Sequence, residues 1–295
     1  MMEKKLRFAL FGNTYQAKKS ASVSRILAYL YARGAEISIE RGFFNFLKKG
    51  GGARIEPARL FDGSDFSADF VISMGGDGTL LKAAMHVGGK QIPIIGVNMG
   101  RLGFLASVTP DGIERTLDAI YDGDYSVEQR SAIRVGSEGS PLGGCPFALN
   151  DIAVLKRDNA SMITIHVSID GEYVVTYRAD GLVVSTPTGS TAYSLSNGGP
   201  IIVPGTGVLC LTPVAPHSLN IRPIVIPDTA RVALSVESRS HNYLVAIDGR
   251  SEKCSDMTRL EISKAEYIIK TVRGDNVNYI TTLREKMMWG ADNRG

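Results

Sequence analysis

Through about the first 125 residues, short apolar runs alternate with stretches whose apolar side chains recur at helical spacing. Residues 6–11 form an apolar run typical of a buried strand, and residues 23–30 place apolar side chains on one face of a helix. Two further buried strands are predicted at residues 70–74 and 92–97, each followed by a helical stretch. Because strands that alternate with helices usually pair in parallel, this part predicts an α/β domain with a mainly parallel sheet.

After about residue 125 the period of the pattern changes. Residues 163–170 alternate apolar and polar side chains, and Asp170-Gly171 favours a hairpin turn into the next strand. We therefore expect an α/β nucleotide-binding domain over residues 1–127 and a β-rich, antiparallel and sandwich-like domain over residues 128–278. A last helix is expected within residues 279–295, as a segment that could pack back on the first domain.

Composition and charge exclude several classes of protein. Glycine makes up 32 of the 295 residues, above the roughly 7% of an average protein, which indicates tight turns and close backbone approach. The net charge of +3 is too small to indicate a nucleic-acid surface. Three widely spaced cysteines favour neither a disulfide framework nor a zinc site, and no apolar run is long enough to span a membrane. A soluble, cytoplasmic protein is expected.

The strongest local motif joins the predicted strand at residues 70–74 to the helix that follows it. It reads Gly75-Gly76-Asp77-Gly78-Thr79. Glycines let the backbone approach a ligand, and a helix start offers unpaired N–H groups and the positive end of its dipole. These features predict a phosphate cradle, although the loop matches neither the Walker loop nor the GxGxxG fingerprint.

Asp77 is the unusual member of this loop, because a carboxylate would repel bound phosphates unless it had a chemical role. It could accept a proton from an attacking hydroxyl, which is typically worth about 10²–10⁴-fold in rate. It could instead hold Mg²⁺ against phosphate oxygens. An ordinary β-turn with no ligand remains the alternative.

A second segment, residues 177–194, is rich in small polar side chains. An apolar strand at residues 182–184 leads into Ser190, Thr191 and Ser194, whose hydroxyls are short donors and acceptors, and Tyr193 adds an aromatic face. This composition suits a polar ligand held close to the backbone. A Ser/Thr-rich turn without a ligand is the alternative.

Taken together, the two segments resemble the NAD kinase family. Residues 75–79 match its GGDGT motif, and residues 180–193 match its second, glycine- and threonine-rich motif almost residue for residue. Shorter stretches at 98–105, 148–151 and 197–200 agree, so that the resemblance runs from about residue 69 to residue 250. GGDGT alone is shared with lipid kinases and in part with phosphofructokinases, whereas the second motif is more specific.

The resemblance implies a two-domain enzyme that phosphorylates the adenosine 2′-hydroxyl of NAD with ATP and Mg²⁺, giving NADP. It implies a site in the cleft between an α/β and a β-rich domain, a homodimer or homotetramer, and NAD and ATP as the small-molecule partners. No nucleic acid or membrane is expected as a partner. Asp77 would activate the hydroxyl as general base. The residues expected to line the NAD site are Gly78, Phe104, Asn150, Asp151, Asp180, Thr191, Ala192, Tyr193, Ser196 and Ala215.

The backbone of Gly75, Gly76 and Thr79 is expected to bind the phosphates of ATP. Asp151 stands where the family more often has Glu, so its contact could become water-mediated. Arg178 and Asp248 are weaker candidates, with a surface arginine and a simple hairpin turn as their alternatives. A lipid kinase that shares the glycine loop, or an NAD(P) sensor without activity, are the alternative functions. The choice between ATP and polyphosphate as donor stays open.

Overall fold

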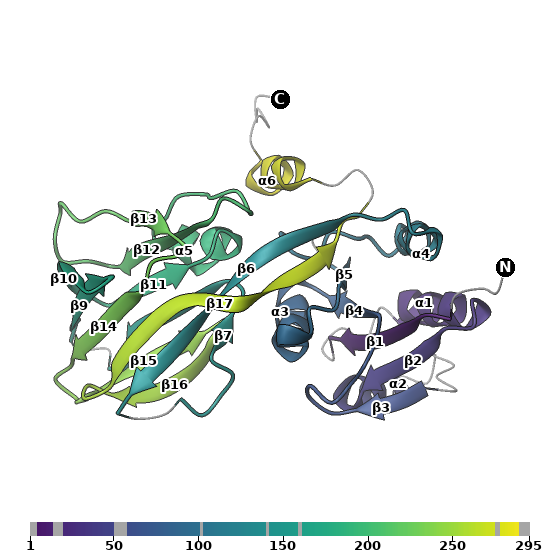
Figure 1. Cartoon of the computed structure of the whole chain (residues 1–295), viewed down its shortest axis with the longest axis horizontal. Coiled ribbons are helices and arrows are strands. Elements are labelled where there is room, and N and C mark those ends of the chain that lie inside the picture. Colours follow the sequence, from purple (N-terminus) through teal and green to yellow (C-terminus); the bar gives the residue numbers. More distant parts are fainter. Residues whose placement is uncertain are drawn as a thin grey trace. The chain divides into compact units, whose positions relative to one another are not determined.

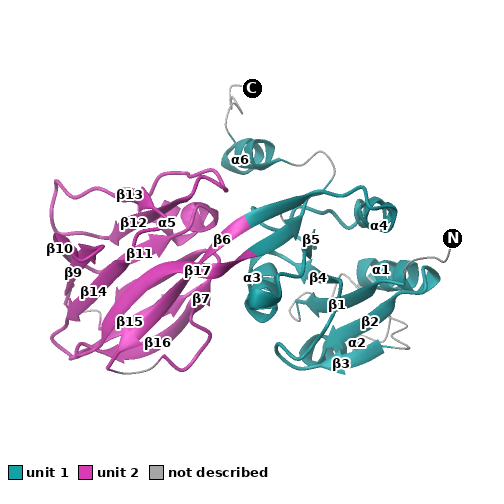
Figure 2. Ribbon diagram, viewed as in Figure 1, with its two compact units in different colours: residues 1–129, 269–295 teal, residues 130–268 magenta. Residues whose placement is uncertain are grey.

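The computed structural model describes residues 5–13, 20–49, 58–100, 103–139, 142–158, 161–274 and 278–288. The chain forms two compact units (Figure 2). Unit 1 contains residues 1–129 and 269–295, and unit 2 contains residues 130–268. Among the described residues, no helix is both long and apolar enough to cross a lipid bilayer.

Unit 1 is built on a parallel sheet in the order β3-β2-β1-β4-β5 (Figure 1). Its strands are β1 (Arg7–Gly12), β2 (Glu36–Glu40), β3 (Ala58–Phe61), β4 (Phe70–Gly75) and β5 (Ile94–Asn98). The helices are α1 (Ser20–Ala32), α2 (Arg41–Lys49), α3 (Asp77–Val87), α4 (Ile113–Asp122) and α6 (Tyr279–Met287), with a short 3₁₀ helix η2 (Gly88–Lys90).

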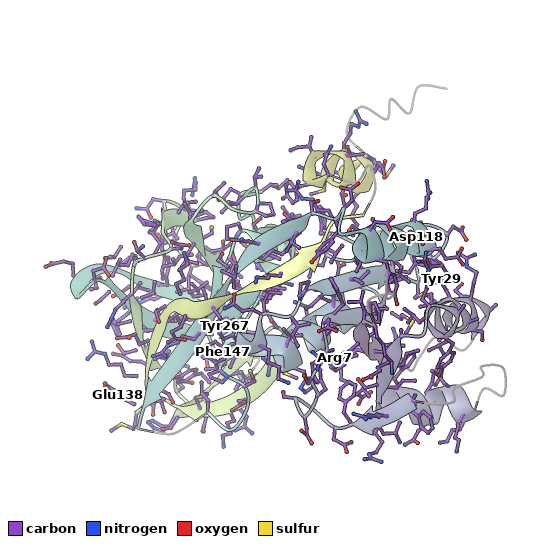
Figure 3. All side chains as sticks on the ribbon, turned by 45° about the vertical axis from the view of Figure 1, so that its right-hand side comes forward. Arg7, Tyr29, Asp118, Glu138, Phe147 and Tyr267 are labelled. Atoms are coloured by element: carbon purple, nitrogen blue, oxygen red, sulfur yellow. The ribbon has the colours of Figure 1, made fainter. Side chains whose placement is uncertain are left out.

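The central strands of unit 1 are buried because helices cover both faces of a parallel sheet. Every residue of β4 and β5 is buried, which explains their unbroken apolar sequences. Helices α1 and α4 are fastened by a polar contact as well as by packing, since the Tyr29 hydroxyl donates a hydrogen bond to the Asp118 carboxylate (Figure 3). Helix α4 ends at Gly123, whose positive φ of 78° lets its N–H close the last turn.

Unit 2 is an antiparallel β structure. One sheet runs β13-β12-β11-β8-β15-β16, and a second antiparallel run has the order β10-β9-β14-β17. The strands are β6 (Val127–Glu138), β7 (Phe147–Ala148), β8 (Asp151–Lys156), β9 (Ile163–Ile169), β10 (Glu172–Ala179), β11 (Gly181–Ser185), β12 (Val208–Val214), β13 (Ile224–Pro227), β14 (Val232–Glu237), β15 (Asn242–Ile247), β16 (Arg250–Ser255) and β17 (Arg259–Val272). Two short helical turns are η3 (Thr188–Thr191) and α5 (Tyr193–Ser196). The predicted fold class, an α/β part with a mainly parallel sheet followed by an antiparallel β-rich part, is confirmed.

The core of unit 2 fills the space between its two sheets. Apolar side chains of β8 and β11 from one sheet pack in the same cluster as those of β9 and β14 from the other. The predicted hairpin between β9 and β10 is present, and its turn residues Asp170 and Gly171 both have positive φ, at 51° and 89°. A two-residue turn with positive φ at both positions matches the twist of the strands that it joins.

Strand β17 belongs to both units. Its first residues pair with β14 in unit 2, and Thr271 near its end pairs in parallel with Ile94 of β5 in unit 1. The chain therefore returns to unit 1 within a single strand of 14 residues. Helix α6 follows, and it begins with an N-cap in which the Asn278 side chain accepts the Thr281 N–H at 2.8 Å.

Candidate active site

The glycine loop lies where strand β4 gives way to helix α3. Gly76 is the N-cap residue, and its carbonyl accepts the N–H groups of Thr79 and Leu80. A Cβ on Gly75 would lie 2.1 Å from the Thr79 hydroxyl oxygen, so the loop tolerates only glycine there. Gly78 is exposed and has open space where a side chain would stand. The helix start is thus accessible to a ligand from this side, as a phosphate cradle requires.

The Asp77 carboxylate is tied to the segment that follows β5. Its Oδ2 accepts the Phe104 N–H at 2.8 Å, and its Oδ1 accepts the N–H groups of Leu105 at 3.0 Å and Ala106 at 3.1 Å. A Cβ on Gly103 would lie 2.0 Å from Oδ1, so this approach also requires glycine. The sequence indicated a chemical role for Asp77 but gave no sign of this anchoring role, because the donors are backbone groups about 27 residues away.

Phe104 connects the anchored segment to helix α6. The centroid of its ring lies 6.2 Å from that of Tyr279, and the Lys286 Nζ lies 4.7 Å from the Phe104 centroid. Tyr279 and Lys286 stand at the two ends of α6. The helix predicted near the C-terminus therefore contacts a predicted site residue, and neither Tyr279 nor Lys286 was a candidate from sequence.

In unit 2, a second carboxylate organises the start of β8. Asp248 lies in the turn between β15 and β16 with a φ of 47°. Its side chain accepts the N–H groups of Leu149 and Asn150, each at 2.8 Å, and of Asp151 at 3.2 Å. Its own N–H donates to the Asp151 carbonyl at 3.0 Å. The structure thus brings together Asn150, Asp151 and Asp248, three residues that the sequence had singled out separately.

Three polar groups in this cluster, those of Asn150, Asp151 and Asp248, are buried at a cost in free energy. Burial raises the pKa of Asp151 to about 7, and the negative charge of Asp248 adds to the rise. Burial also raises the pKa of Asp248, although its three backbone N–H donors oppose this. The Asn150 Oδ1 is buried and has no hydrogen-bond partner within the described part of the chain. An acceptor left in this state is costly unless a ligand donates to it.

The turn at residues 186–189 is hydrogen-bonded to the backbone of Leu149 and Asn150. The Thr186 hydroxyl donates to the Leu149 carbonyl at 2.6 Å and accepts the Gly189 N–H at 3.1 Å, while the Thr186 N–H donates to the Asn150 carbonyl at 2.9 Å. A Cβ on Gly189 would lie 2.1 Å from that carbonyl oxygen. The second motif is therefore packed directly against the Asn-Asp segment, and its conformation depends on these small residues.

Several other residues predicted to line the NAD site are accessible. Thr191 and Ala192 are half-buried, and Tyr193, Ser196 and Ala215 are exposed. Asp180 forms an ion pair with Lys156, with the Lys156 Nζ 2.8 Å from a carboxylate oxygen. Arg178, the weaker candidate two residues before Asp180, is exposed and is not the ion-pair partner of Asp180 in the described part of the chain.

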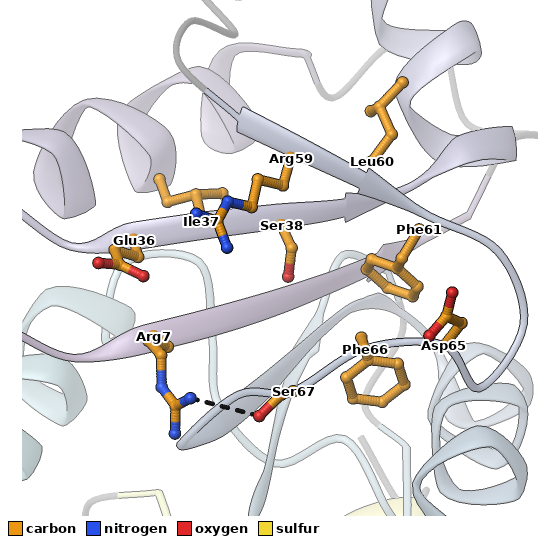
Figure 4. Close-up of a pocket in the computed structure, with 10 residues that line it drawn as sticks. All are labelled: Arg7, Glu36, Ile37, Ser38, Arg59, Leu60, Phe61, Asp65, Phe66 and Ser67. Carbon is orange, nitrogen blue, oxygen red and sulfur yellow. Dashed lines mark hydrogen bonds between the residues drawn. The ribbon is translucent and has the colours of Figure 1, made fainter.

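A cavity of about 430 Å³ lies elsewhere in unit 1, against β1, β2 and β3 (Figure 4). None of the predicted site residues lines it. Its Arg7 guanidinium is already paired with Asp69 at 2.8 Å and bonded to Ser67 at 3.3 Å. Glu36 and Asp65 bring negative charge to the same walls, so the cavity has no charge that would select one class of ligand.

The described residues contain no group of three or more histidine, cysteine, aspartate or glutamate side chains that could hold a metal ion. Asp77 is the carboxylate nearest to the phosphate cradle along the chain, and both of its oxygens already accept N–H groups. Magnesium is usually held by one or two carboxylates together with substrate phosphates, so this part of the chain offers no complete cage of its own.

Comparison with known proteins identifies the family of the chain. A family model for the ATP-NAD kinase N-terminal domain matches residues 17–125, and one for the ATP-NAD kinase C-terminal domain matches residues 149–274. The NAD kinase of Bacteroides fragilis is 55% identical over 289 residues, covering 98% of this chain and all of the relative. That of Porphyromonas gingivalis (strain W83) is 41% identical over 286 residues, covering 97% of this chain and 98% of the relative.

Two solved structures share the fold. A yeast NADH kinase complexed with NADH matches with a TM-score of 0.88 at 19% identity, covering 99% of this chain and 90% of that one. An NAD kinase from Archaeoglobus fulgidus in complex with ATP matches with a TM-score of 0.73 at 26% identity, covering 96% and 99%. With both domain models matched and a 55% identical relative over nearly its whole length, the chain belongs to the NAD kinase family.

Proposed function

We propose that this chain transfers the terminal phosphoryl group of ATP to the adenosine 2′-hydroxyl of NAD, which gives NADP and ADP. Membership of the family makes the chain an enzyme, a kinase that acts on NAD with ATP as the phosphoryl donor. The observation that carries the assignment of roles is the anchored glycine loop, in which an accessible helix start stands beside the Asp77 carboxylate.

In this proposal, unit 1 supplies the groups that act on the phosphates. The backbone of Gly75, Gly76 and Thr79 binds the ATP phosphates, and the exposed Gly78 lets the ligand approach. Asp77 accepts the proton of the 2′-hydroxyl as its oxygen bonds to the terminal phosphorus and the bond to ADP breaks. The three N–H donors fix the direction of the carboxylate, so Asp77 can orient the hydroxyl as well as accept its proton. Phosphoryl transfer depends mainly on such positioning.

Unit 2 supplies groups that recognise NAD. Asn150 is assigned to the sugar hydroxyls, because its buried Oδ1 needs a donor. Asp248 holds the backbone of the Asn150 segment and is assigned as a positioning residue. The accessible side chains of the second motif are assigned to the remainder of the substrate. The assigned lining residues of unit 2 are Asp151, Asp180, Thr191, Ala192, Tyr193, Ser196 and Ala215.

Two further parts of the proposal rest on the family, and a third, the location in the cell, rests on composition. Magnesium would be held mainly by the phosphates of ATP and would neutralise part of their charge. The active form is a homodimer or homotetramer. The protein acts in the cytoplasm.

A matched set of acceptors tests the function. We expect the purified chain to convert NAD to NADP with ATP and Mg²⁺, with the product identified by an NADP-specific dehydrogenase. Sphingosine and diacylglycerol presented in micelles are the competing acceptors, and polyphosphate is the competing donor. Phosphorylation of a lipid without formation of NADP would contradict the proposal. Binding of NAD without turnover would favour a sensor instead.

A further inference from the structure

The last helix of the described chain brings a cation to the anchored loop. Lys286 lies near the C-terminal end of α6, and its Nζ is 4.7 Å from the centroid of the Phe104 ring (Figure 1 shows α6 in yellow). The N–H of the same Phe104 donates to the Asp77 carboxylate at 2.8 Å. One residue therefore connects the ammonium group to the carboxylate, and all three residues belong to unit 1.

Lys286 is free to bind an anion. Within the described part of the chain it has no ion pair with a carboxylate, and its side chain is exposed. Lys82, the basic residue next to the glycine loop on α3, differs in this respect, because its Nζ lies 3.4 Å from the Glu40 carboxylate. A contact between a cation and an aromatic ring is weak at an exposed site, so an anionic ligand competes with it easily.

The change in charge at the reacting hydroxyl indicates which anion Lys286 would bind. Before transfer, the hydroxyl beside Asp77 is neutral. After transfer it carries a phosphate with a charge of about −1.5 to −2, as other phosphate monoesters do at neutral pH. Residues 75–79 and residues 103–106 contribute backbone N–H groups and contain no lysine or arginine. The Lys286 ammonium group beside the Phe104 ring is then the nearest source of positive charge that these contacts reveal.

We propose that Lys286 binds the 2′-phosphate of NADP, the group that the reaction has just transferred. This inference rests on the proposed assignment of the reacting hydroxyl to Asp77. Because the contact forms only as the phosphoryl group arrives, Lys286 stabilises the transition state and the product more than it stabilises bound NAD. Lys286 is thereby a residue that distinguishes product from substrate.

The test compares the binding of NADP with the binding of NAD by calorimetry, which needs no turnover. For Lys286→Met we expect the affinity for NADP to fall about 10-fold or more, as for loss of one charge-assisted hydrogen bond, with the affinity for NAD changed less than about 2-fold. The kcat should fall while KM for NAD stays constant. Lys286→Arg should keep most of the preference for NADP, and added salt should weaken NADP binding more in the wild type than in Lys286→Met.

Arg284→Met is the matched control, since Arg284 is an exposed cation on the same helix. It should leave both affinities unchanged. Thermal unfolding of each variant shows whether α6 still packs, and Lys286→Gln replaces Lys286→Met if the latter unfolds early. An unchanged ratio of NADP to NAD affinity in folded Lys286→Met and Lys286→Gln would overturn the inference, as would a rise confined to KM for ATP. Failure of the proposed function is distinct, because the wild type itself would then make no NADP.

Discussion

Each unit contains a carboxylate that accepts three consecutive backbone N–H groups, and the two carboxylates have different roles. In unit 1 the Asp77 carboxylate accepts three consecutive backbone N–H groups, those of residues 104–106. In unit 2 the Asp248 carboxylate accepts those of residues 149–151. Both carboxylates are half-buried, but Asp77 lies at an accessible helix start beside the exposed Gly78, whereas Asp248 lies next to the buried Asp151. A carboxylate that anchors backbone N–H groups can therefore stay accessible to a substrate, or it can serve only to position neighbouring residues.

The largest effect is expected at Asp77, where the anchor and the proposed base coincide. Asp77→Asn should lower kcat by about 10²–10⁴-fold, since it removes the proton acceptor and turns an amide NH₂ toward a backbone N–H. The measurement is kcat as a function of pH. If Asp77 is the base, the decline of kcat toward low pH disappears in the variant.

Asp122→Asn is the control for this change, because Asp122 is an exposed carboxylate at the end of α4. It should leave kcat unaltered. A reduction of kcat in Asp77→Asn by one constant factor at every pH would assign Asp77 to anchoring alone. Turnover near the wild-type value would contradict both roles.

The next effect is expected at Asp248, where the anchor is separate from the chemistry. Asp248→Asn leaves at least one of three N–H groups without its acceptor in a buried place, so we expect the free energy of unfolding to fall by about 1–3 kcal/mol. The Asn150 segment should shift, which raises KM for NAD more than it lowers kcat. Urea unfolding and steady-state kinetics measure the two effects. A loss of kcat as large as that of Asp77→Asn would show that the two carboxylates do not divide their roles in this way.

A third effect is expected at Asp151, in unit 2, and concerns how the free energy of unfolding depends on pH. Asp151 has a pKa of about 7 in the folded chain, against about 3.9 when unfolded, so the folded state binds one more proton between these values. Its stabilising contribution is present at lower pH and is lost as pH rises through 7. The free energy of unfolding should fall by about 2 kcal/mol from pH 5.5 to pH 8 on account of this group.

Urea unfolding at the two pH values checks this expectation. Asp151→Asn keeps the shape of the side chain and cannot ionise, so it should remove that part of the decline. An identical decline in the variant would show that other groups cause it. Asp122→Asn again serves as the exposed control.

The smallest effect is expected at Thr186, which supports Asn150 without a charge. Thr186→Val removes the hydroxyl that donates to the Leu149 carbonyl and accepts the Gly189 N–H, while it preserves the branched shape. We expect a loss of stability of about 1–2 kcal/mol and a modest rise in KM for NAD. Ser218→Ala, in an exposed loop of the same unit, is the control. An unchanged KM would show that the turn does not govern the position of Asn150.

The sequence could predict the elements and the motifs, but not the contacts between distant segments. The alternation of apolar runs predicted the parallel sheet, and the glycines at residues 75–78 predicted a close approach of the backbone. The anchoring roles of Asp77 and Asp248 were out of reach, because a backbone N–H leaves no mark in the sequence. The ion pair between Lys156 and Asp180 forms because β8 and β11 are neighbouring strands. The periodicity of the sequence does not specify which strands are neighbours. Lys286 lies about 200 residues from the loop that it approaches.

Strand β17 has a consequence for the order in which the chain acquires its structure. Unit 2 is one continuous stretch, whereas unit 1 joins residues 1–129 with residues 269–295. During synthesis, all of unit 2 leaves the ribosome before Thr271 can join Ile94. The sheet of unit 1 therefore lacks its neighbour along β5 until the last residues of β17 have been made.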